Sequence, residues 1–245
     1  MKTQKVLFSF LFLLLSISFA KAQTAEDIYQ KYADAIGGKS AWDAVTSIKA
    51  TGYATMGGMD FAFTQTSKRI NKVLLEIIIQ GMTMKQVYDG TTAWMLNPFT
   101  GGKKPEIVGE DMARQFRNMA KIGGELLNYA EYGSTIELLG KEDFDGTPVY
   151  KLKLVTSDGT EIIYFIDAEK YIDLKSISKT MMSGKEIEST TLYSNYKDVN
   201  GLKIPFTMDV KTKGGQTMGE GQIIRMDKTE LNVEVDDAIF VMPSE

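Results

Sequence analysis

The sequence predicts a mainly β protein with a few helices (α+β), built on one strongly curled antiparallel sheet. Residues 68–99 read as three consecutive strands, because apolar residues alternate and Gln80-Gly81 and Asp89-Gly90 mark turns. From Ser134 to the end, turn signals recur at short intervals without a Pro/Ser-rich linker. Together these segments indicate a single sheet of about ten or more strands, and an open sheet of that size must curl.

The first 22 residues have the composition of a cleavable signal peptide. Lys2 and Lys5 precede an apolar run, and Ala20-Lys21-Ala22 fits the small-x-small rule for cleavage before Gln23. The apolar run is shorter than the roughly 20 residues that a membrane span needs. We therefore expect residues 1–22 to be removed and residues 23–245 to form one exported, soluble domain.

Composition excludes several kinds of active site. The chain has no His and no Cys, which removes Ser-His-Asp and Cys-His nucleophiles, the usual zinc ligands, disulfides and a lipid-modified Cys. A net charge of −4 gives no indication of a nucleic-acid partner. Paired carboxylates such as Glu142, Asp143 and Asp145 are the remaining catalytic candidates, but they lie at a turn, where solvated acids are expected. We expect no enzyme activity, no metal and no cofactor.

Two helical segments interrupt the strands. Thr24 is an expected N-cap with Asp27 three residues on, and Gly37-Gly38 should end that first helix. A turn containing Trp42 follows. Residues 110–127 have helical spacing, and Gly123-Gly124 should kink or end this second helix and permit movement.

A concave, apolar surface is expected inside the curled sheet. The chain has 14 Met residues, and Met fits either of two roles, since it fills gaps in cores and also adapts to varied apolar ligands. Small residues at 50, 52 and 54 facing Phe61 and Phe63 likewise fit core packing or a cavity wall. One helix covers only part of such a sheet, which favours an apolar ligand cavity.

The residues expected to line this cavity come from the strands and from the 110–127 helix. On the strands they are Phe61, Phe63, Leu75, Ile77, Met82, Met84, Trp94 and Leu96, and on the helix they are Met112, Phe116 and Met119. Trp94 fits a core position as well as a ligand contact, because large aromatic residues on strands usually pack. Tyr53 and Tyr88 are ambiguous between the cavity and its rim.

Three segments resemble the LolA-type periplasmic lipoprotein carriers, in which a basic-Arg-Pro-Asn stretch precedes a DG-x-x-x-W strand and an NP turn. The matching residues here are 68–72 (KRINK), 87–94 (VYDGTTAW) and 97–99 (NPF), and residues 236–243 are similar to the family's closing stretch. The order of elements is similar over essentially the whole mature chain. Ile70 stands where the family has proline, and residues 144–182 form more regular strands than in the shortest carriers.

This resemblance implies a half-open, strongly curled antiparallel β-barrel with a helical lid. It implies that Arg69 holds the lid through hydrogen bonds to helix backbone carbonyls, although an exposed strand-edge position beside Lys68 and Lys72 is the simpler interpretation of a lone arginine. The implied function is a monomeric periplasmic carrier of lipid or lipoprotein acyl chains, working towards the outer membrane with inner- and outer-membrane partner proteins. The alternative is a periplasmic sensor or adaptor that binds an envelope protein and uses lipid as a signal.

Overall fold

A computed structural model describes residues 23–99, 104–182, 184–214 and 221–243. The expected signal peptide lies outside these residues. Within them, no helix has the length and apolar character needed to cross a membrane.

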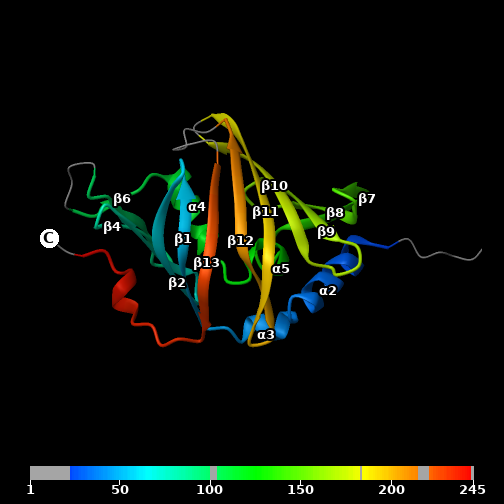
Figure 1. Cartoon of the computed structure of the whole chain (residues 1–245), viewed down its shortest axis with the longest axis horizontal. Helices are drawn as coiled ribbons and strands as arrows, with labels where there is room; N and C mark the ends of the chain where they lie inside the picture. The colour runs from blue at the N-terminus through cyan, green and yellow to red at the C-terminus, as the bar shows by residue number, and fades with distance from the viewer. Residues whose placement is uncertain (1–22, 100–103, 183, 215–220, 244–245) are drawn as a thin grey trace, which may run out of the picture.

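The described strands form one antiparallel sheet in the order β6-β5-β4-β3-β2-β1-β13-β12-β11-β10-β9-β8-β7, so that only β1–β13 joins strands distant in sequence. The sheet curls but does not close, which confirms the mainly β class and the curled antiparallel sheet (Figure 1). Its strands are β1 (Ser47–Met56), β2 (Met59–Lys68), β3 (Lys72–Ile79), β4 (Met82–Tyr88), β5 (Ala93–Leu96), β6 (Glu106–Ile107), β7 (Thr135–Phe144), β8 (Thr147–Val155), β9 (Glu161–Asp167), β10 (Asp173–Met182), β11 (Lys185–Val199), β12 (Leu202–Lys213) and β13 (Gly221–Leu231).

The described helices are short: α2 (Ala25–Ala35), α3 (Lys39–Asp43), α4 (Glu110–Met119), α5 (Gly124–Leu127) and a final 3-10 turn, η1 (Asp237–Phe240). Figure 1 shows α4 and α5 behind the central strands and α2 and α3 near their lower ends. Buried residues of α2, α3 and α5 pack with β8, β9 and β12 in the largest apolar cluster. This cluster anchors one side of the sheet.

Strands β3 to β5 are covered on both faces, as the two-sided apolar pattern of β3 requires. On one face Val73 and Tyr88 pack with Phe116 of α4. On the other, Leu74 and Trp94 pack with Phe240 of η1. The chain after β13 therefore seals the outer face of the strands whose inner face meets α4.

The expected helix boundaries are found. Thr24 Oγ1 accepts a hydrogen bond from the Asp27 amide at 3.1 Å, and the Asp27 carboxylate accepts one from the Thr24 amide at 2.9 Å, a capping box. The predicted 110–127 helix is divided into α4 and α5 at Gly123-Gly124, which have φ angles of 81° and 76°. α4 itself ends at Met119, before the glycine pair, and Gly123 is the N-cap of α5 in a left-handed conformation that only glycine adopts at low cost.

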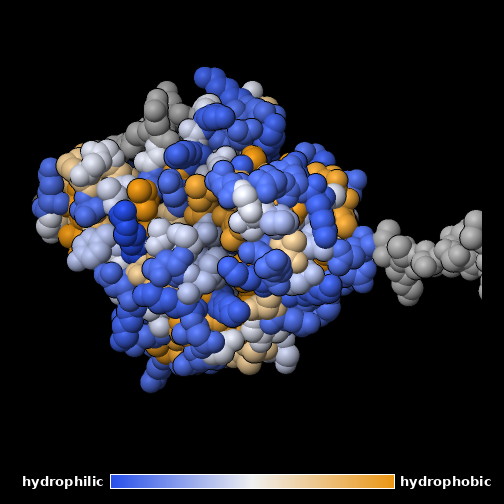
Figure 2. Space-filling model, turned by 45° about the vertical axis from the view of Figure 1, so that its right-hand side comes forward, coloured by the Kyte–Doolittle hydropathy of each residue, from blue (hydrophilic) through white to orange (hydrophobic). Residues whose placement is uncertain are grey.

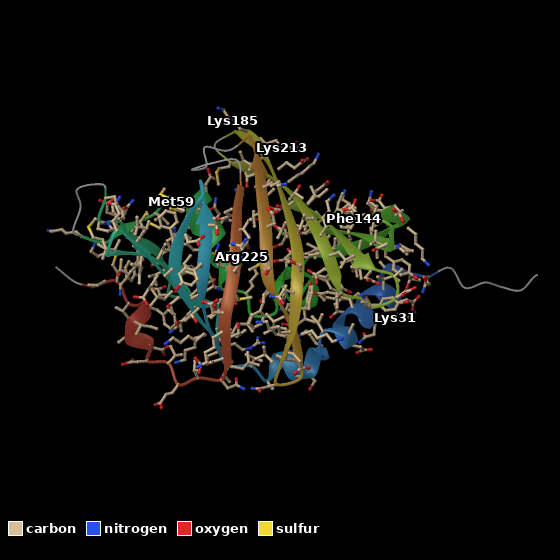
Figure 3. All side chains as sticks on the ribbon, in the orientation of Figure 1. Lys31, Met59, Phe144, Lys185, Lys213 and Arg225 are labelled. Atoms are coloured by element: carbon tan, nitrogen blue, oxygen red, sulfur yellow. The ribbon has the colours of Figure 1, made fainter. Side chains whose placement is uncertain are left out.

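The ends of the long hairpins carry flexible side chains. Figure 3 labels Met59 at the tip of the β1–β2 hairpin and Lys185 and Lys213 near the tips of β11 and β12. On the face shown in Figure 2, hydrophobic residues lie in separate patches among hydrophilic ones.

Candidate ligand cavity

A cavity of about 1150 Å³ lies between the sheet and the helices. Its wall includes residues from β1 to β4, from β9 to β13, and from each of the described helices α2 to α5. A volume of this size is slightly above the usual range of about 300–1,000 Å³ for small-molecule sites. The concave face expected from the curled sheet is therefore only partly filled by side chains.

One half of the cavity has a mostly apolar wall made by β1 to β4, in which Gln65, Ser67 and Gln86 are the polar side chains. Phe63, Ile77 and Met84 are register partners on three neighbouring strands, so their side chains lie side by side on the inner face. Ala50 and Ala54 of β1 face the same space. Ala54 also packs with Phe63 and Ile77, so the small residues of β1 serve both core packing and the cavity wall.

The other half is lined by hydroxyl-bearing aromatic residues. Tyr32 of α2, Tyr164 of β9, and Tyr193 and Tyr196 of β11 all contribute to the wall, together with Asp173 at the start of β10. Burial raises the pKa of all four tyrosine hydroxyls, and that of Tyr193 to about 12. These groups are therefore neutral hydrogen-bonding groups at physiological pH.

Few charged groups reach the cavity. Lys121 and Glu125 form an ion pair at 2.5 Å, four residues apart, and both line the wall. Lys203 and Asp173 are the other ionisable side chains apart from the tyrosines, and no arginine is among the described residues of the lining. No group of three or more His, Cys, Asp or Glu side chains suited to a metal ion is found in the described part of the chain.

Five of the residues that the sequence places at the cavity do line it: Phe63, Leu75, Ile77 and Met84 on the strands and Met119 on α4. A role for them in ligand contact remains a prediction. Two further predicted residues, Phe61 and Met82, lie on the inner face but not in the lining of the cavity. They are the register partners of Ala54 and Ile79, which do line it.

The remaining four predicted residues lie elsewhere. Trp94 and Leu96 belong to the cluster on the outer face with Phe240, and the Trp94 indole donates a 3.0 Å hydrogen bond to the Phe240 carbonyl oxygen. Phe116 is 2% exposed in the core between α4 and β3 to β5, whereas Met112 is 40% exposed. The register of β4 and β5 explains why Trp94 and Leu96 miss the cavity. Tyr88 pairs with Ala93, which places Ala93 on the inner face and Trp94 and Leu96 on the outer face.

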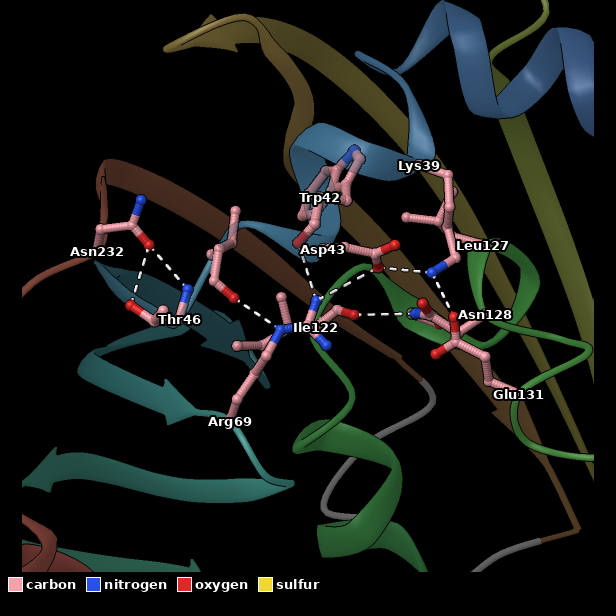
Figure 4. A network of polar contacts seen from close by, with 12 residues as sticks. Lys39, Trp42, Asp43, Thr46, Arg69, Ile122, Leu127, Asn128, Glu131 and Asn232 are labelled. Carbon is pink, nitrogen blue, oxygen red and sulfur yellow. Dashed lines mark hydrogen bonds and ion pairs between the residues drawn. The ribbon is translucent and has the colours of Figure 1, made fainter.

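Arg69, directly after β2, contacts the α3 segment (Figure 4). Its Nε donates a hydrogen bond to the Val45 carbonyl oxygen at 2.7 Å, and its Nη2 donates one to the Trp42 carbonyl oxygen at 2.8 Å. Asp43 lies 3.8 Å from the same Nη2. Asp43 in turn pairs with Lys39, which also pairs with Glu131. Arg69 thereby connects the end of β2 to a helix whose Trp42 lines the cavity.

The tyrosines and Asp173 were not among the residues expected at the site. Tyr193 and Tyr196 are three residues apart, and strict strand alternation would direct them to opposite faces. Asn195 between them has a φ of 54°, which interrupts the alternation, and both line the cavity. No local signal in the sequence marks Asp173, because its strand also contains Lys175, Ser178 and other polar residues.

The geometry defines a class: a curled, unclosed antiparallel sheet whose inner face encloses an apolar cavity under short helices. Solved structures specify it further. A LolA superfamily protein from Nitrosomonas europaea superposes with a TM-score of 0.60 at 16% identity, covering 90% of this chain and 98% of that one. An outer membrane lipoprotein-sorting protein domain from Vibrio parahaemolyticus gives 0.59 at 16% identity, with 88% and 97% covered.

A DUF1329 family protein from Desulfovibrio piger gives a TM-score of 0.58 at 12% identity, covering 90% of this chain and 98% of that one. No protein-family model and no curated protein sequence matches the chain. The chain therefore has a LolA-like fold, which confirms the structural part of the resemblance seen in the sequence. At these identities the likeness establishes the fold alone.

Proposed function

We propose that this protein is a periplasmic carrier that binds acyl chains of a lipid or lipoprotein in its cavity and delivers them towards the outer membrane. The observation that carries the proposal is the contiguous inner wall of Phe63, Ile77 and Met84 beside an unfilled volume of about 1150 Å³. The expected signal peptide supports an extracytoplasmic location. The domain binds without catalysing a reaction in this proposal, in keeping with a chain that has neither His nor Cys.

The energy available from such a wall suits reversible carriage. Apolar burial contributes about 25 cal/mol per Å², so covering roughly 400 Å² of acyl chain gives on the order of 10 kcal/mol before the costs of ordering the ligand. Micromolar binding needs about 8 kcal/mol after those costs. The cavity can therefore hold a chain firmly enough for transport and still release it.

Binding is tested by native mass spectrometry of protein purified from its own envelope and by titration with a fluorescent C16 fatty acid. We expect co-purifying lipid and saturable binding. Ala50→Phe places an aromatic ring in the cavity and should weaken probe binding at least tenfold, whereas Thr51→Phe, on the opposite face of β1, should leave it unchanged. Absence of lipid together with absence of probe binding would rule the proposal out.

Delivery is tested separately with donor and acceptor vesicles. A carrier should increase lipid transfer in proportion to its concentration, and Ala50→Phe should abolish the increase. A stable complex with an envelope protein, combined with lipid binding but no transfer, would instead support the sensor or adaptor function.

A further inference from the structure

The end of the cavity opposite the apolar wall has the composition of a polar recognition site. Tyr32, Tyr164 and Asp173 are 6%, 8% and 8% exposed, and they come from three different elements. Tyr193 and Tyr196 complete the group from β11. All five side chains line the same cavity, and the Tyr196 hydroxyl contacts the Asp173 carboxyl group directly.

The Tyr193 and Tyr196 hydroxyls each make a hydrogen bond within the protein, and each hydroxyl oxygen can accept a further one from a ligand. The Tyr193 hydroxyl pairs with Ser176 Oγ at 2.9 Å, and either oxygen can be the donor. The Tyr196 hydroxyl lies 2.7 Å from the Asp173 carbonyl oxygen and 2.8 Å from Asp173 Oδ1. One hydroxyl has one hydrogen, so it satisfies one of these two oxygens, and a protonated Asp173 carboxyl would donate back across the second contact.

Burial favours that protonated form. It raises the pKa of the Asp173 carboxyl above its ordinary value, while the hydrogen bond from Tyr196 partly opposes the shift. A neutral carboxyl both donates and accepts hydrogen bonds, as the four tyrosine hydroxyls do. This end of the cavity then presents a set of uncharged donors and acceptors.

The charges around the cavity do not suit an anionic headgroup. Phosphate recognition in proteins relies heavily on Arg, and no described lining residue is an arginine. Lys121 is neutralised by Glu125 at 2.5 Å and also lies over the Tyr132 ring. The second lysine of the lining, Lys203, is exposed and is the register partner of Asp198, so an acidic residue lies across from it. An anion beside Asp173 would in addition hold that buried carboxyl protonated or be repelled by its charge.

We propose that the tyrosine-lined end of the cavity, formed by Tyr32, Tyr164, Tyr193, Tyr196 and Asp173, is a subsite for an uncharged, hydroxyl-bearing headgroup of the bound lipid. This inference rests on the proposed function, because the acyl chain of the same ligand occupies the apolar half. It narrows the cargo to amphiphiles such as acylglycerols or glycosylated lipids, which share neutral hydroxyl groups.

The test compares three ligands with a C12 chain and different polar ends: monolauroylglycerol, laurate and dodecyltrimethylammonium, each below its critical micelle concentration. Isothermal titration calorimetry on the mature protein gives the three dissociation constants. We expect monolauroylglycerol to bind at least tenfold more tightly than either charged ligand.

Two variants test whether the tyrosine hydroxyls cause the preference for monolauroylglycerol. Tyr196→Phe and Tyr193→Phe each remove one hydroxyl and keep the ring, and we expect each to weaken monolauroylglycerol binding about 5- to 20-fold, the equivalent of about 1–2 kcal/mol, with little effect on laurate. Ile77→Ala, in the apolar half, is the matched control and should weaken all three ligands by a similar factor. Thermal melts followed by circular dichroism identify any variant that fails to fold. If one tyrosine variant fails to fold, the binding constants of the other one test the headgroup subsite.

The outcomes separate the two proposals. Equal affinities for the three ligands, or tighter binding of laurate or of the ammonium ligand, would overturn the headgroup subsite while leaving acyl-chain binding in place. A preference for monolauroylglycerol that survives both tyrosine substitutions would overturn it as well. No binding of any of the ligands would overturn the proposed function itself.

Discussion

Arg69 Nη2 donates a 2.8 Å hydrogen bond to the carbonyl oxygen of Trp42, whose side chain lines the cavity. With the second bond, from Nε to the Val45 carbonyl oxygen, the planar guanidinium contacts two backbone oxygens at the C-terminal end of α3. The loop after β2 and the helix over the cavity are therefore held together by one side chain.

Replacing Arg69 with Ala should lower the free energy of unfolding by about 1–3 kcal/mol. This value is smaller than for a fully buried charged side chain, because Arg69 is 33% exposed and water screens its interactions. Arg69→Lys keeps the charge but not the fork geometry and should have an intermediate effect. Urea unfolding measures the free energy, and hydrogen exchange should show faster exchange of backbone amides in and after α3. If α3 acts as part of a lid, dissociation of a bound fatty-acid probe should also become several-fold faster. Unchanged stability and exchange in Arg69→Ala would contradict the role described here.

The sheet could be predicted from the sequence because its signals are local. Alternation of apolar residues and turn pairs such as Asp89-Gly90 depend only on neighbouring residues, and the strands are found where these signals lie. Which face of a strand is concave depends on the whole sheet. In β3 both faces are apolar, so alternation alone could not show that Leu75 would line the cavity and Leu74 the outer cluster.

The polar end of the cavity could not be predicted either, because it too depends on how the whole sheet folds. It brings together Tyr32, Tyr164 and Tyr193, which are far apart in the sequence and meet only when the sheet curls towards α2. Trp94, in contrast, was expected at the cavity but lies on the outer face. The aromatic residue suggested a ligand contact, but the C-terminal η1 segment covers it, and no local pattern indicates that a turn near residue 240 packs on β5.

Phe240→Ala should lower the free energy of unfolding by about 3–5 kcal/mol, because Phe240 is fully buried against Leu74, Val87 and Trp94. The adjacent Ile239 is 39% exposed, and Ile239→Ala should change stability much less. Chemical denaturation measures both. Probe affinity of folded Phe240→Ala should match that of the wild type, since the cluster lies on the outer face; a selective loss of affinity would show that this face contributes to ligand binding.

Asp173 predicts a specific dependence of stability on pH. Its folded-state pKa is raised above the ordinary value of 3.8 by burial, so its favourable contribution is fully present below that value and is lost as pH rises through the folded pKa. The free energy of unfolding of the wild type minus that of Asp173→Asn should therefore fall as pH rises above the ordinary carboxyl pKa of 3.8. Groups common to both proteins cancel in this difference. A difference that rises with pH would mean that the carboxylate form is the one stabilised in the folded protein.

Gly123 and Gly124 offer a matched pair at the start of α5, because both have left-handed backbone angles but different surroundings. A Cβ at Gly123 would lie 2.8 Å from Leu127 Cδ2, whereas a Cβ at Gly124 meets no atom within 4 Å. Gly124→Ala should cost about 1 kcal/mol from backbone strain alone. Gly123→Ala adds a clash with a fully buried leucine and should cost at least about 1 kcal/mol more.

Thermal and urea unfolding of the two variants measures these losses of stability. The expected result is that Gly123→Ala is less stable than Gly124→Ala. Asn128 Nδ2 donates 3.0 Å hydrogen bonds to the carbonyl oxygens of Ile122 and Gly124, so this turn is fixed from within the core. A Gly123→Ala variant as stable as Gly124→Ala would show that Leu127 gives way easily and that the turn is looser than its contacts indicate. If the turn is also where the helices move to release ligand, Gly123→Ala should change the dissociation rate of a bound fatty-acid probe more than Gly124→Ala does.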